Sequence, residues 1–220
     1  MAPLEPVSTE RVIELLEGEY GIRQWQTEGD PVDVLVRTVL SQNTSDVNSY
    51  RAFDRLRAGF ENWEAVASAP VDLIARAIRS GGLFRIKALR IQQILQQIDQ
   101  DQGRISLDFL KSKTAAEAED YLMHLPGVGH KTARCVLLFS LGKPTLPVDT
   151  HILRVARRLG LIVPGTSIDK AHRLLQEQIA PPQVYQFHVH MIEHGRRVCR
   201  ARRPACERCP LAVVCPGKRC

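Results

Sequence analysis

Apolar residues recur at helical spacing along almost the whole chain, and this periodicity is the strongest constraint on the fold. No stretch shows the strict alternation of apolar and polar residues that is typical of a half-buried strand. Most periodic segments follow a Ser, Thr, Asp or Pro, which are residues that favour the start of a helix. The sequence therefore predicts an all-α protein.

The expected helices are separated by short polar or Gly-containing turns. They cover about residues 8–20, 31–40, 45–56, 70–80, 85–102, 114–125, 130–141, 149–159, 167–180 and 183–197. The helix over 31–40 is apolar on most sides, so we expect it to be central. Residues expected to face the core include four in the helix 45–56 and two in the helix 85–102, namely Val47, Tyr50, Phe53, Leu56, Ile86 and Leu89.

Residues 114–141 are predicted to form a helix, a tight Gly-rich turn (LPGVG, 125–129) and a second helix. Gly127 and Gly129 permit backbone angles that let successive N–H groups converge on an anion such as a DNA phosphate. Taken alone, this turn is equally compatible with a plain corner between two helices.

Lys131 lies in the first turn of the second helix of this pair. The positive end of the helix dipole disfavours a cation there and favours the neutral, nucleophilic amine that a Schiff base requires. A lysine that contacts a DNA phosphate beside the turn explains the same position equally well. His130 precedes it and is a second candidate for phosphate contact, in its protonated form.

Four cysteines lie in a C-terminal segment that lacks helical periodicity: Cys199, Cys206, Cys209 and Cys215. A metal centre would staple such a segment, and both a structural zinc ion and a [4Fe–4S] cluster accept four cysteines. The segment has a single short Cys-x2-Cys pair, whereas zinc sites commonly have two, so the spacing favours iron–sulfur over zinc. Cys135 is expected in the core, and Cys220 has no expected ligand role.

The basic residues are concentrated near the C-terminus. Between His194 and Cys220 there are eight Lys or Arg residues and one Glu, so this tail accounts for the whole net charge of +6. Such a segment commonly faces nucleic-acid phosphate, and a merely solvated basic tail is the alternative. The arginines expected to contact DNA are Arg200, Arg202, Arg203 and Arg208.

No stretch approaches the roughly 18 consecutive apolar residues of a membrane span. Residues 1–20 also lack the apolar segment of a secretory signal. We expect an intracellular monomer, in the cytoplasm or nucleoid if the source is bacterial, with reduced cysteines and no membrane partner.

The run LPGVGHKTARCVLLFSLGKPTLPVDTHILRVARRLGL, residues 125–161, closely resembles the hairpin and active-site region of the endonuclease III family. These are DNA glycosylase/AP lyases of the helix–hairpin–helix superfamily. The resemblance extends from about Pro31, through LSQNTSD at 40–46 and Gly82-Leu83-Phe84, to the final cysteines.

The resemblance implies two helical lobes with a DNA-binding cleft between them. One lobe is a six-helix barrel over residues 26–143, which includes the helix–hairpin–helix at about 114–141. The other combines residues 1–25 and 144–220 and carries the cluster loop 199–215. The four cysteines of that loop match the ligands of one [4Fe–4S] cluster in the family.

By the same resemblance, Lys131 attacks the sugar C1′ and Asp149 assists it. Asp149 also precedes Thr150 and an apolar helical face, which is first of all the position of a helix N-cap. A carboxylate there also suits stabilising positive charge on the deoxyribose or taking a proton from the amine. The two interpretations are compatible.

An enzyme that reacts at C1′ must turn the nucleotide out of the duplex and fill the gap. Leu83 matches the family's wedge, and the gap-filling position matches Asn43 by gapless alignment or Gln42 by residue type. His151 matches a DNA-contacting position. A hydrophobic contact at a helix end, for Leu83, and ordinary loop residues, for the two amides, are the alternatives.

The implied function is a bifunctional DNA glycosylase/AP lyase of base excision repair. It would remove oxidised pyrimidines from double-stranded DNA and cleave abasic sites by β-elimination through a lysine Schiff base. The alternatives are a mismatch or adenine-type glycosylase of the same superfamily, which typically lacks the lysine, and a non-catalytic DNA-binding protein. His190 and His194 are expected to be polar packing residues rather than metal ligands.

Overall fold

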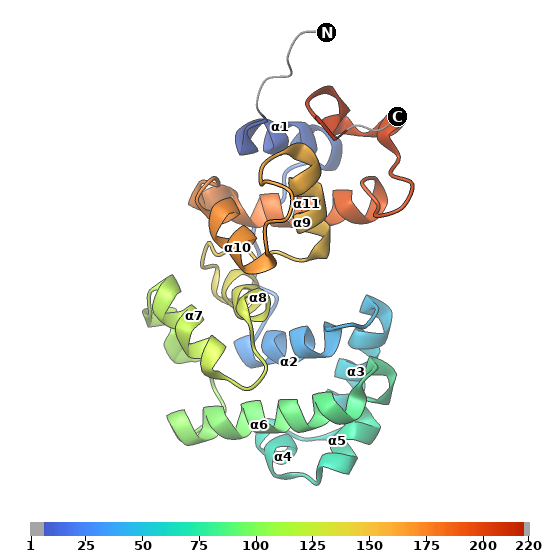
Figure 1. Cartoon of the computed structure of the whole chain (residues 1–220). Helices are drawn as coiled ribbons and strands as arrows, with labels where there is room; N and C mark the ends of the chain where they lie inside the picture. The colour runs from blue at the N-terminus through green and yellow to red at the C-terminus, as the bar shows by residue number, and fades with distance from the viewer. Residues whose placement is uncertain (1–6, 218–220) are drawn as a thin grey trace. The chain divides into compact units, whose positions relative to one another are not determined.

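A computed structural model describes residues 7–217, and this range is helical without a β-strand (Figure 1). The α-helices are α1 (Thr9–Tyr20), α2 (Pro31–Ser41), α3 (Asp46–Gly59), α4 (Trp63–Ser68), α5 (Val71–Ala77), α6 (Phe84–Gln102), α7 (Ala115–His124), α8 (His130–Leu141), α9 (Thr150–Leu159), α10 (Ile168–Gln176) and α11 (Val184–Arg197). Short 3₁₀ helices join them: η1 (Arg79–Gly81), η2 (Asp108–Ser112), η3 (Pro181–Gln183), η4 (Cys206–Arg208) and η5 (Pro210–Val213). The predicted all-α class is confirmed.

Capping side chains determine where several helices begin. Ser8, Asp30 and Thr114 each accept a hydrogen bond from a backbone N–H in the first turn of α1, α2 and α7. Pro31 occupies the first position of α2, where its missing N–H costs nothing. The sequence does not predict α4, because its six residues are too few to display a helical repeat.

The chain forms two compact units. One is continuous, Thr27–Lys143, and is called the internal unit below. The other, called the terminal unit, combines Met1–Gln26 with Pro144–Cys220. Within the described residues, every helix is too short or too polar to cross a lipid bilayer.

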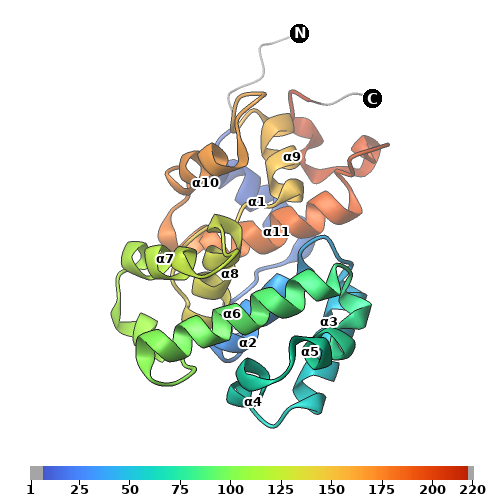
Figure 2. The ribbon, with the colours of Figure 1, turned by 60° about the horizontal axis from the view of Figure 1, so that its bottom comes forward.

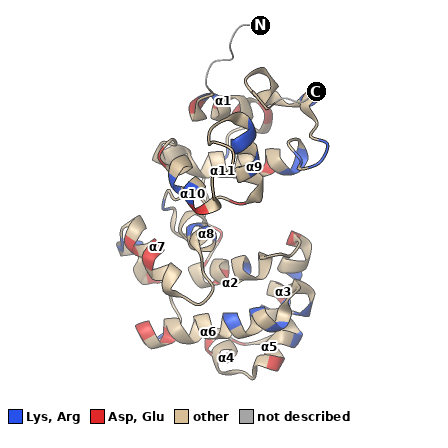
Figure 3. Cartoon of the chain, in the orientation of Figure 1, with Lys and Arg blue, Asp and Glu red and all other residues tan. Residues whose placement is uncertain are grey.

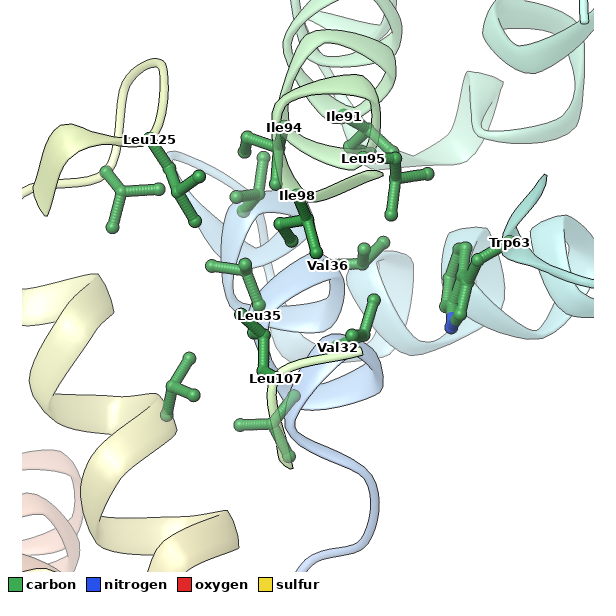
Figure 4. Packing of buried hydrophobic residues seen from close by; sticks show 14 of the residues in the cluster. Val32, Leu35, Val36, Trp63, Ile91, Ile94, Leu95, Ile98, Leu107 and Leu125 are labelled. Carbon is green, nitrogen blue, oxygen red and sulfur yellow. The ribbon is translucent and has the colours of Figure 1, made fainter. Parts of the chain in front are cut away.

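In the internal unit α2 is the core helix. Eight of its eleven residues are buried, and it packs against α3, α6 and α8. Figure 4 shows Val32, Leu35 and Val36 of α2 facing Ile94 and Ile98 of α6, and Figure 2 shows α6 running beside α2. Full burial of one aliphatic side chain contributes about 1.5–3 kcal/mol, so this helix pair is a major source of stability.

The expected core face of α3 is wrong in part. Val47 and Tyr50 are 68% and 52% exposed. The small residue Ala52 lies on the buried side instead, where it allows η1 to come close. A Cβ added to Gly81 of η1 would lie 3.3 Å from the Ala52 Cβ. Close backbone approach therefore selects the face of α3 that turns inward, against its simple apolar pattern.

The expected core face of α6 also needs correction at its first turn. Ile86 and Leu89 are 57% and 47% exposed, whereas Lys87 is only 2% exposed. Lys87 is on the same face as Ile91 and Ile94, one and two turns further along the helix, and both of these are fully buried. The inward face of α6 therefore begins with a lysine.

In the terminal unit α11 packs against α1 and α9. Phe187 of α11 is fully buried. His190 Nε2 lies 2.9 Å from the carbonyl oxygen of Gly21, and His194 Nδ1 lies 3.1 Å from the hydroxyl of Tyr20. These contacts make both histidines polar packing residues, as expected from the sequence.

Candidate active site and DNA interface

The turn between α7 and α8 leaves the start of α8 open. Gly127 has φ 68°, a conformation that glycine adopts without strain, and a Cβ there would overlap the Arg90 side chain. Gly129 is the N-cap of α8, and no other group lies within 4 Å of where its Cβ would be. No side chain caps α8 in the described structure. A phosphate oxygen can therefore reach its first N–H groups.

His130 and Arg134 hold α8 against α7 through one carboxylate. His130 Nδ1 is 2.8 Å from Glu119 Oε1, and Arg134 Nε donates to the same oxygen at 2.6 Å. Burial alone would raise the pKa of Glu119, but the hydrogen bonds from Arg134 and His130 outweigh it and lower the pKa. The imidazole of His130 is thus held toward Glu119, and any phosphate contact by this ring must coexist with that bond.

Lys131 is half-buried in the first turn of α8. Its amine has no hydrogen-bond or ion-pair partner among residues 7–217, unlike His130 on the preceding position. Thr132, the next residue, is buried and fixed by a contact from Gln42. The amine therefore sits on an ordered helix start while remaining available to a ligand.

Asp149 is the N-cap of α9. Its Oδ1 accepts hydrogen bonds from the backbone N–H groups of His151 and Ile152, each at 2.8 Å. Its Oδ2 makes no hydrogen bond with any described residue. One oxygen thus fixes the orientation of the carboxylate, and the other is not engaged by a hydrogen bond within the described residues. His151 is held by Arg154, whose Nη2 lies 3.1 Å from His151 Nδ1.

The two loops that the sequence predicts to open the duplex share an unusual backbone feature. Three non-glycine residues in the described range have positive φ: Asn43 at 52°, Leu83 at 46° and Arg203 at 50°. Such angles are costly for a branched residue like leucine and tend to cluster at functional sites. Leu83 is also 57% exposed, so the fold holds an apolar side chain in solvent on a strained backbone.

The two amides of the first loop differ in their surroundings. Gln42 is half-buried: its Oε1 accepts from Arg90 at 3.1 Å and its Nε2 donates to Thr132 at 3.3 Å. Asn43 is exposed. Both hydrogen-bonding ends of Gln42 are thus used within the internal unit, whereas the side chain of Asn43 is presented to solvent.

The four cysteines of the loop 199–215 line a single pocket. It holds about 350 Å³ of empty space, part of it open to solvent, and its other walls include Val198, Pro204 and Ala205. Burial raises the pKa of the Cys209 thiol to about 11 and raises that of Cys215, and repulsion among the thiolates adds to both shifts. A cationic centre reverses this cost, because it binds the thiolate form.

The four cysteines of this pocket are the donor set that both metal centres considered accept. No three Cys, His, Asp or Glu side chains in the part of the chain that is described come together as ligands of one metal ion. In a [4Fe–4S] cluster each thiolate binds its own iron, so the sulfurs stand farther apart than around one zinc ion. Four thiols around one pocket fit the donor set of a four-iron cluster, which is held by four thiolates. Cys220 lies outside the described residues.

The arginines of the cluster loop form an exposed basic segment after α11, which Figure 3 shows. Arg208 additionally donates to the carbonyl oxygen of Arg197 at 3.4 Å. The arginines that the sequence predicts to contact DNA are all exposed: Arg200, Arg202, Arg203 and Arg208.

Three long side chains that organise these sites are not predictable as site residues from motifs in the sequence. Lys87 and Arg90 on α6 contact the loops of Gln42 and Gly81, and Arg158 on α9 contacts the cluster loop. The burial of Lys87 is indicated by the sequence, because Lys87 shares helical spacing with Ile91 and Ile94. No sequence pattern indicates the contacts of Arg90 and Arg158, because their partners lie far away in the sequence.

The sequence matches the family model described as "HhH-GPD superfamily base excision DNA repair protein" over residues 36–181. A candidate DNA glycosylase of Arabidopsis thaliana is 37% identical over 172 residues, which are 78% of this chain and 59% of the plant protein. The chain thus spans less than two thirds of that relative. Endonuclease III of Thermotoga maritima is 35% identical over 191 residues, covering 86% of this chain and 84% of the relative.

A solved structure gives a similar result for the fold. A trapped covalent intermediate of endonuclease III with DNA matches this chain with a TM-score of 0.83 and 28% identity. The match covers 96% of this chain and 97% of the other.

Proposed function

We propose that this chain, which belongs to the HhH-GPD superfamily of base-excision DNA repair proteins and, within it, to the endonuclease III family, is a bifunctional DNA glycosylase/AP lyase. As a base-excision-repair DNA glycosylase it binds DNA. The proposed finer activity is removal of oxidised pyrimidines from double-stranded DNA, together with cleavage of abasic sites. The observation that carries the lyase proposal is the amine of Lys131, which has no partner among the described residues and stands beside an open, phosphate-accessible helix start.

In the proposed reaction the Lys131 Nζ forms a bond to C1′ of the damaged nucleotide as the bond from C1′ to the base breaks. The base leaves with the bonding electrons and takes up a proton. Opening of the sugar ring gives a protonated imine between Nζ and C1′. Loss of a proton from C2′ then expels the 3′ phosphate, which nicks the strand, and water hydrolyses the imine to regenerate the lysine.

Asp149 would assist electrostatically. Positive charge develops on the deoxyribose as the base departs, and a carboxylate in a fixed orientation stabilises it without reorganising during the reaction. The two hydrogen bonds to Oδ1 supply that fixed orientation, and Oδ2 is available to take the proton of the attacking amine.

The DNA would be held by three kinds of contact. The backbone N–H groups around Gly127, Gly129 and His130 suit a phosphate of the damaged strand, and the exposed arginines of the cluster loop suit further phosphates. Leu83 would enter the base stack as the nucleotide leaves it, and His151 is proposed to contact DNA near Asp149.

Cys199, Cys206, Cys209 and Cys215 would hold one [4Fe–4S] cluster. The cluster would supply a structural staple for a loop that has little apolar surface of its own. Metal analysis tests this: about four irons per chain are expected, and a colourless protein with one zinc ion would contradict it. Cys135→Ser is the matched control for substitutions of the four loop cysteines, because Cys135 is buried in α8 of the internal unit.

Borohydride trapping on a duplex with an abasic site tests the nucleophile. Wild-type protein is expected to give a covalent protein–DNA adduct, and Lys131→Ala is expected to give none. Lys170→Ala is the matched control, because Lys170 is an exposed lysine of α10 outside the proposed site. An adduct that persists in Lys131→Ala would refute this assignment, and no adduct from the wild type would favour a monofunctional glycosylase or a non-catalytic DNA-binding protein.

A further inference from the structure

Lys87 is a buried cation without a carboxylate partner among the described residues. Its Nζ donates to the carbonyl oxygen of Leu40 at 2.6 Å, to that of Gly81 at 2.7 Å and to Thr44 Oγ1 at 2.7 Å. An ammonium has three donors, and all three are satisfied by neutral acceptors. Burial is the main cause that lowers the pKa of Lys87 to about 8.

The acceptors of Lys87 belong to two different loops. Leu40 and Thr44 bracket the turn that contains Gln42 and Asn43, and Gly81 lies two residues before Leu83. Thr44 Oγ1 also donates to the carbonyl oxygen of Gly81, so the hydroxyl and the ammonium meet on the same oxygen. The two loops are therefore tied together at one buried point.

Burial of the Lys87 ammonium at this point lowers the stability of the fold. An ammonium loses its hydration when it is buried, and no carboxylate among the described residues compensates the charge of Lys87. The loops that Lys87 joins also carry two of the three positive-φ non-glycine residues in the described range, Asn43 and Leu83. A strained backbone persists only where surrounding contacts hold it in place, and Lys87 makes such contacts with both loops.

We propose that Lys87 is a positioning residue that locks the Asn43 loop and the Leu83 loop into one rigid element, so that both side chains enter the duplex together when a nucleotide is turned out. This inference rests on the proposed function, because it assigns the two loops to duplex opening. It requires no contact between Lys87 and DNA. Lys87 acts through the geometry of the two loops.

The same face of α6 continues this element toward the hairpin. Arg90 lies one turn beyond Lys87, donates to Gln42 and packs against Gly127, while Gln42 in turn donates to Thr132 beside Lys131. Gln42 thus connects its loop to α6 and α8 within the internal unit. Asn43 is exposed, so within this proposal it is the amide that would fill the gap left by the nucleotide.

The test uses base flipping, which needs no chemistry. Wild type and Lys87→Met are mixed with a duplex that carries 2-aminopurine opposite or beside a non-reactive abasic analogue, and the fluorescence rise is followed. Lys87→Met is expected to open the duplex about tenfold more slowly or less completely, since it removes three hydrogen bonds from a charged donor. Lys87→Arg is expected to restore part of the signal, and Lys170→Met, an exposed control, to match wild type.

A double-mutant cycle separates positioning from general damage. If Lys87 works through the wedge, Lys87→Met and Leu83→Ala are non-additive, and the double variant opens DNA as slowly as the slower single one. Additive effects, or flipping by Lys87→Met at the wild-type rate, would overturn the proposal. Thr44→Val, which removes only the bridging hydroxyl, replaces Lys87→Met in the same cycle if that variant does not fold.

Borohydride trapping on single-stranded abasic DNA distinguishes this proposal from the proposed function. Trapping there needs Lys131 but no duplex opening, so Lys87→Met is expected to trap as well as wild type. If wild type traps nothing, the lyase assignment fails, while the flipping signal still tests Lys87. Equal losses by Lys87→Met on single strands and duplexes would refute its role in opening.

Discussion

Arg158 Nη1 lies 3.1 Å from Cys199 Sγ and donates at 2.8 Å to the carbonyl oxygen of Arg200. Nη2 of the same guanidinium donates to the carbonyl oxygen of Ala201 at 3.1 Å. One side chain of α9 therefore holds both a candidate cluster ligand and the basic segment that follows it. Asp149 caps the other end of this helix, so the cluster loop and the proposed catalytic carboxylate share one rigid support within the terminal unit.

Arg158→Met is expected to weaken retention of the metal centre. Methionine fills space along the stem but removes the donors to Cys199 and to the loop carbonyls, and hydrogen bonds around metal ligands typically contribute about 10- to 100-fold to metal affinity. Iron content and the loss of visible absorbance during incubation with a chelator measure the effect. Arg173→Met on α10 is the control, because Arg173 is exposed and pairs with Glu177 on the same side of the helix, one turn away. Unchanged iron release in Arg158→Met would refute the role of this contact.

Asp149→Asn separates the helix-capping role of Asp149 from its electrostatic role. The amide oxygen of asparagine can still accept from His151 and Ile152, so thermal unfolding should stay close to wild type. The charge is lost, and we expect the single-turnover rate of base removal to fall by about 100-fold or more. Asp149→Ala is expected to lose activity and about 1 kcal/mol of stability as well. Wild-type activity in Asp149→Asn would show that Asp149 acts only as a helix N-cap.

The helices could largely be predicted from the sequence, because their signals are local. Asp30 followed by Pro31 and an apolar run is sufficient to predict α2 and its central position. The faces of α3 were less predictable. Tyr50 is apolar enough to suggest burial, but the inward side is selected by the close approach of Gly81 to Ala52, two residues that are far apart in the sequence.

The candidate site was predictable where a residue acts through its own backbone position. Asp149 was expected as an N-cap from the residues that follow it, and its cap hydrogen bonds agree. The spacing of Lys87 from Ile91 and Ile94 is compatible with burial, but its role is not predictable, because two of its three partners are the backbone carbonyls of residues 40 and 81, and a carbonyl has no sequence signature. Neutral acceptors at long range are invisible to motif reasoning, however strongly they hold a charge.

The two amides at 42 and 43 are expected to respond differently to truncation. In Asn43→Ala the rate of duplex cleavage should depend less on the base opposite the lesion, because the exposed amide would contact that base in the opened duplex. Gln42→Ala should slow cleavage by a similar factor for every opposite base, because its bonds to Arg90 and Thr132 are internal. Single-turnover rates with each of the four opposite bases measure both. Reversed behaviour would assign gap filling to Gln42.

The stability of the protein should rise with pH through the titration of Lys87. Its pKa is about 8 when folded against 10.5 in the unfolded chain, so between these values the unfolded state binds more protons and the free energy of unfolding increases with pH. Relative to Lys87→Met, which lacks this group, wild type is expected to gain up to about 3 kcal/mol between pH 7.5 and 10.5. Urea unfolding of both proteins across this range measures the difference. A constant difference would mean that burial does not lower the pKa of Lys87.

Leu83→Gly is expected to separate stability from function. Leu83 has φ 46°, a conformation that costs a leucine about 1–2 kcal/mol and costs glycine little, while glycine loses about 0.5–1 kcal/mol through backbone entropy. Because the leucine side chain is 57% exposed, its removal sacrifices little burial. The free energy of unfolding should therefore stay level or rise by up to about 1 kcal/mol, while duplex flipping falls at least as far as in Leu83→Ala. Urea unfolding and 2-aminopurine fluorescence on the same preparations measure the two effects. A large loss of stability would show that Leu83 supports the fold, and undiminished flipping would show that it is not the wedge.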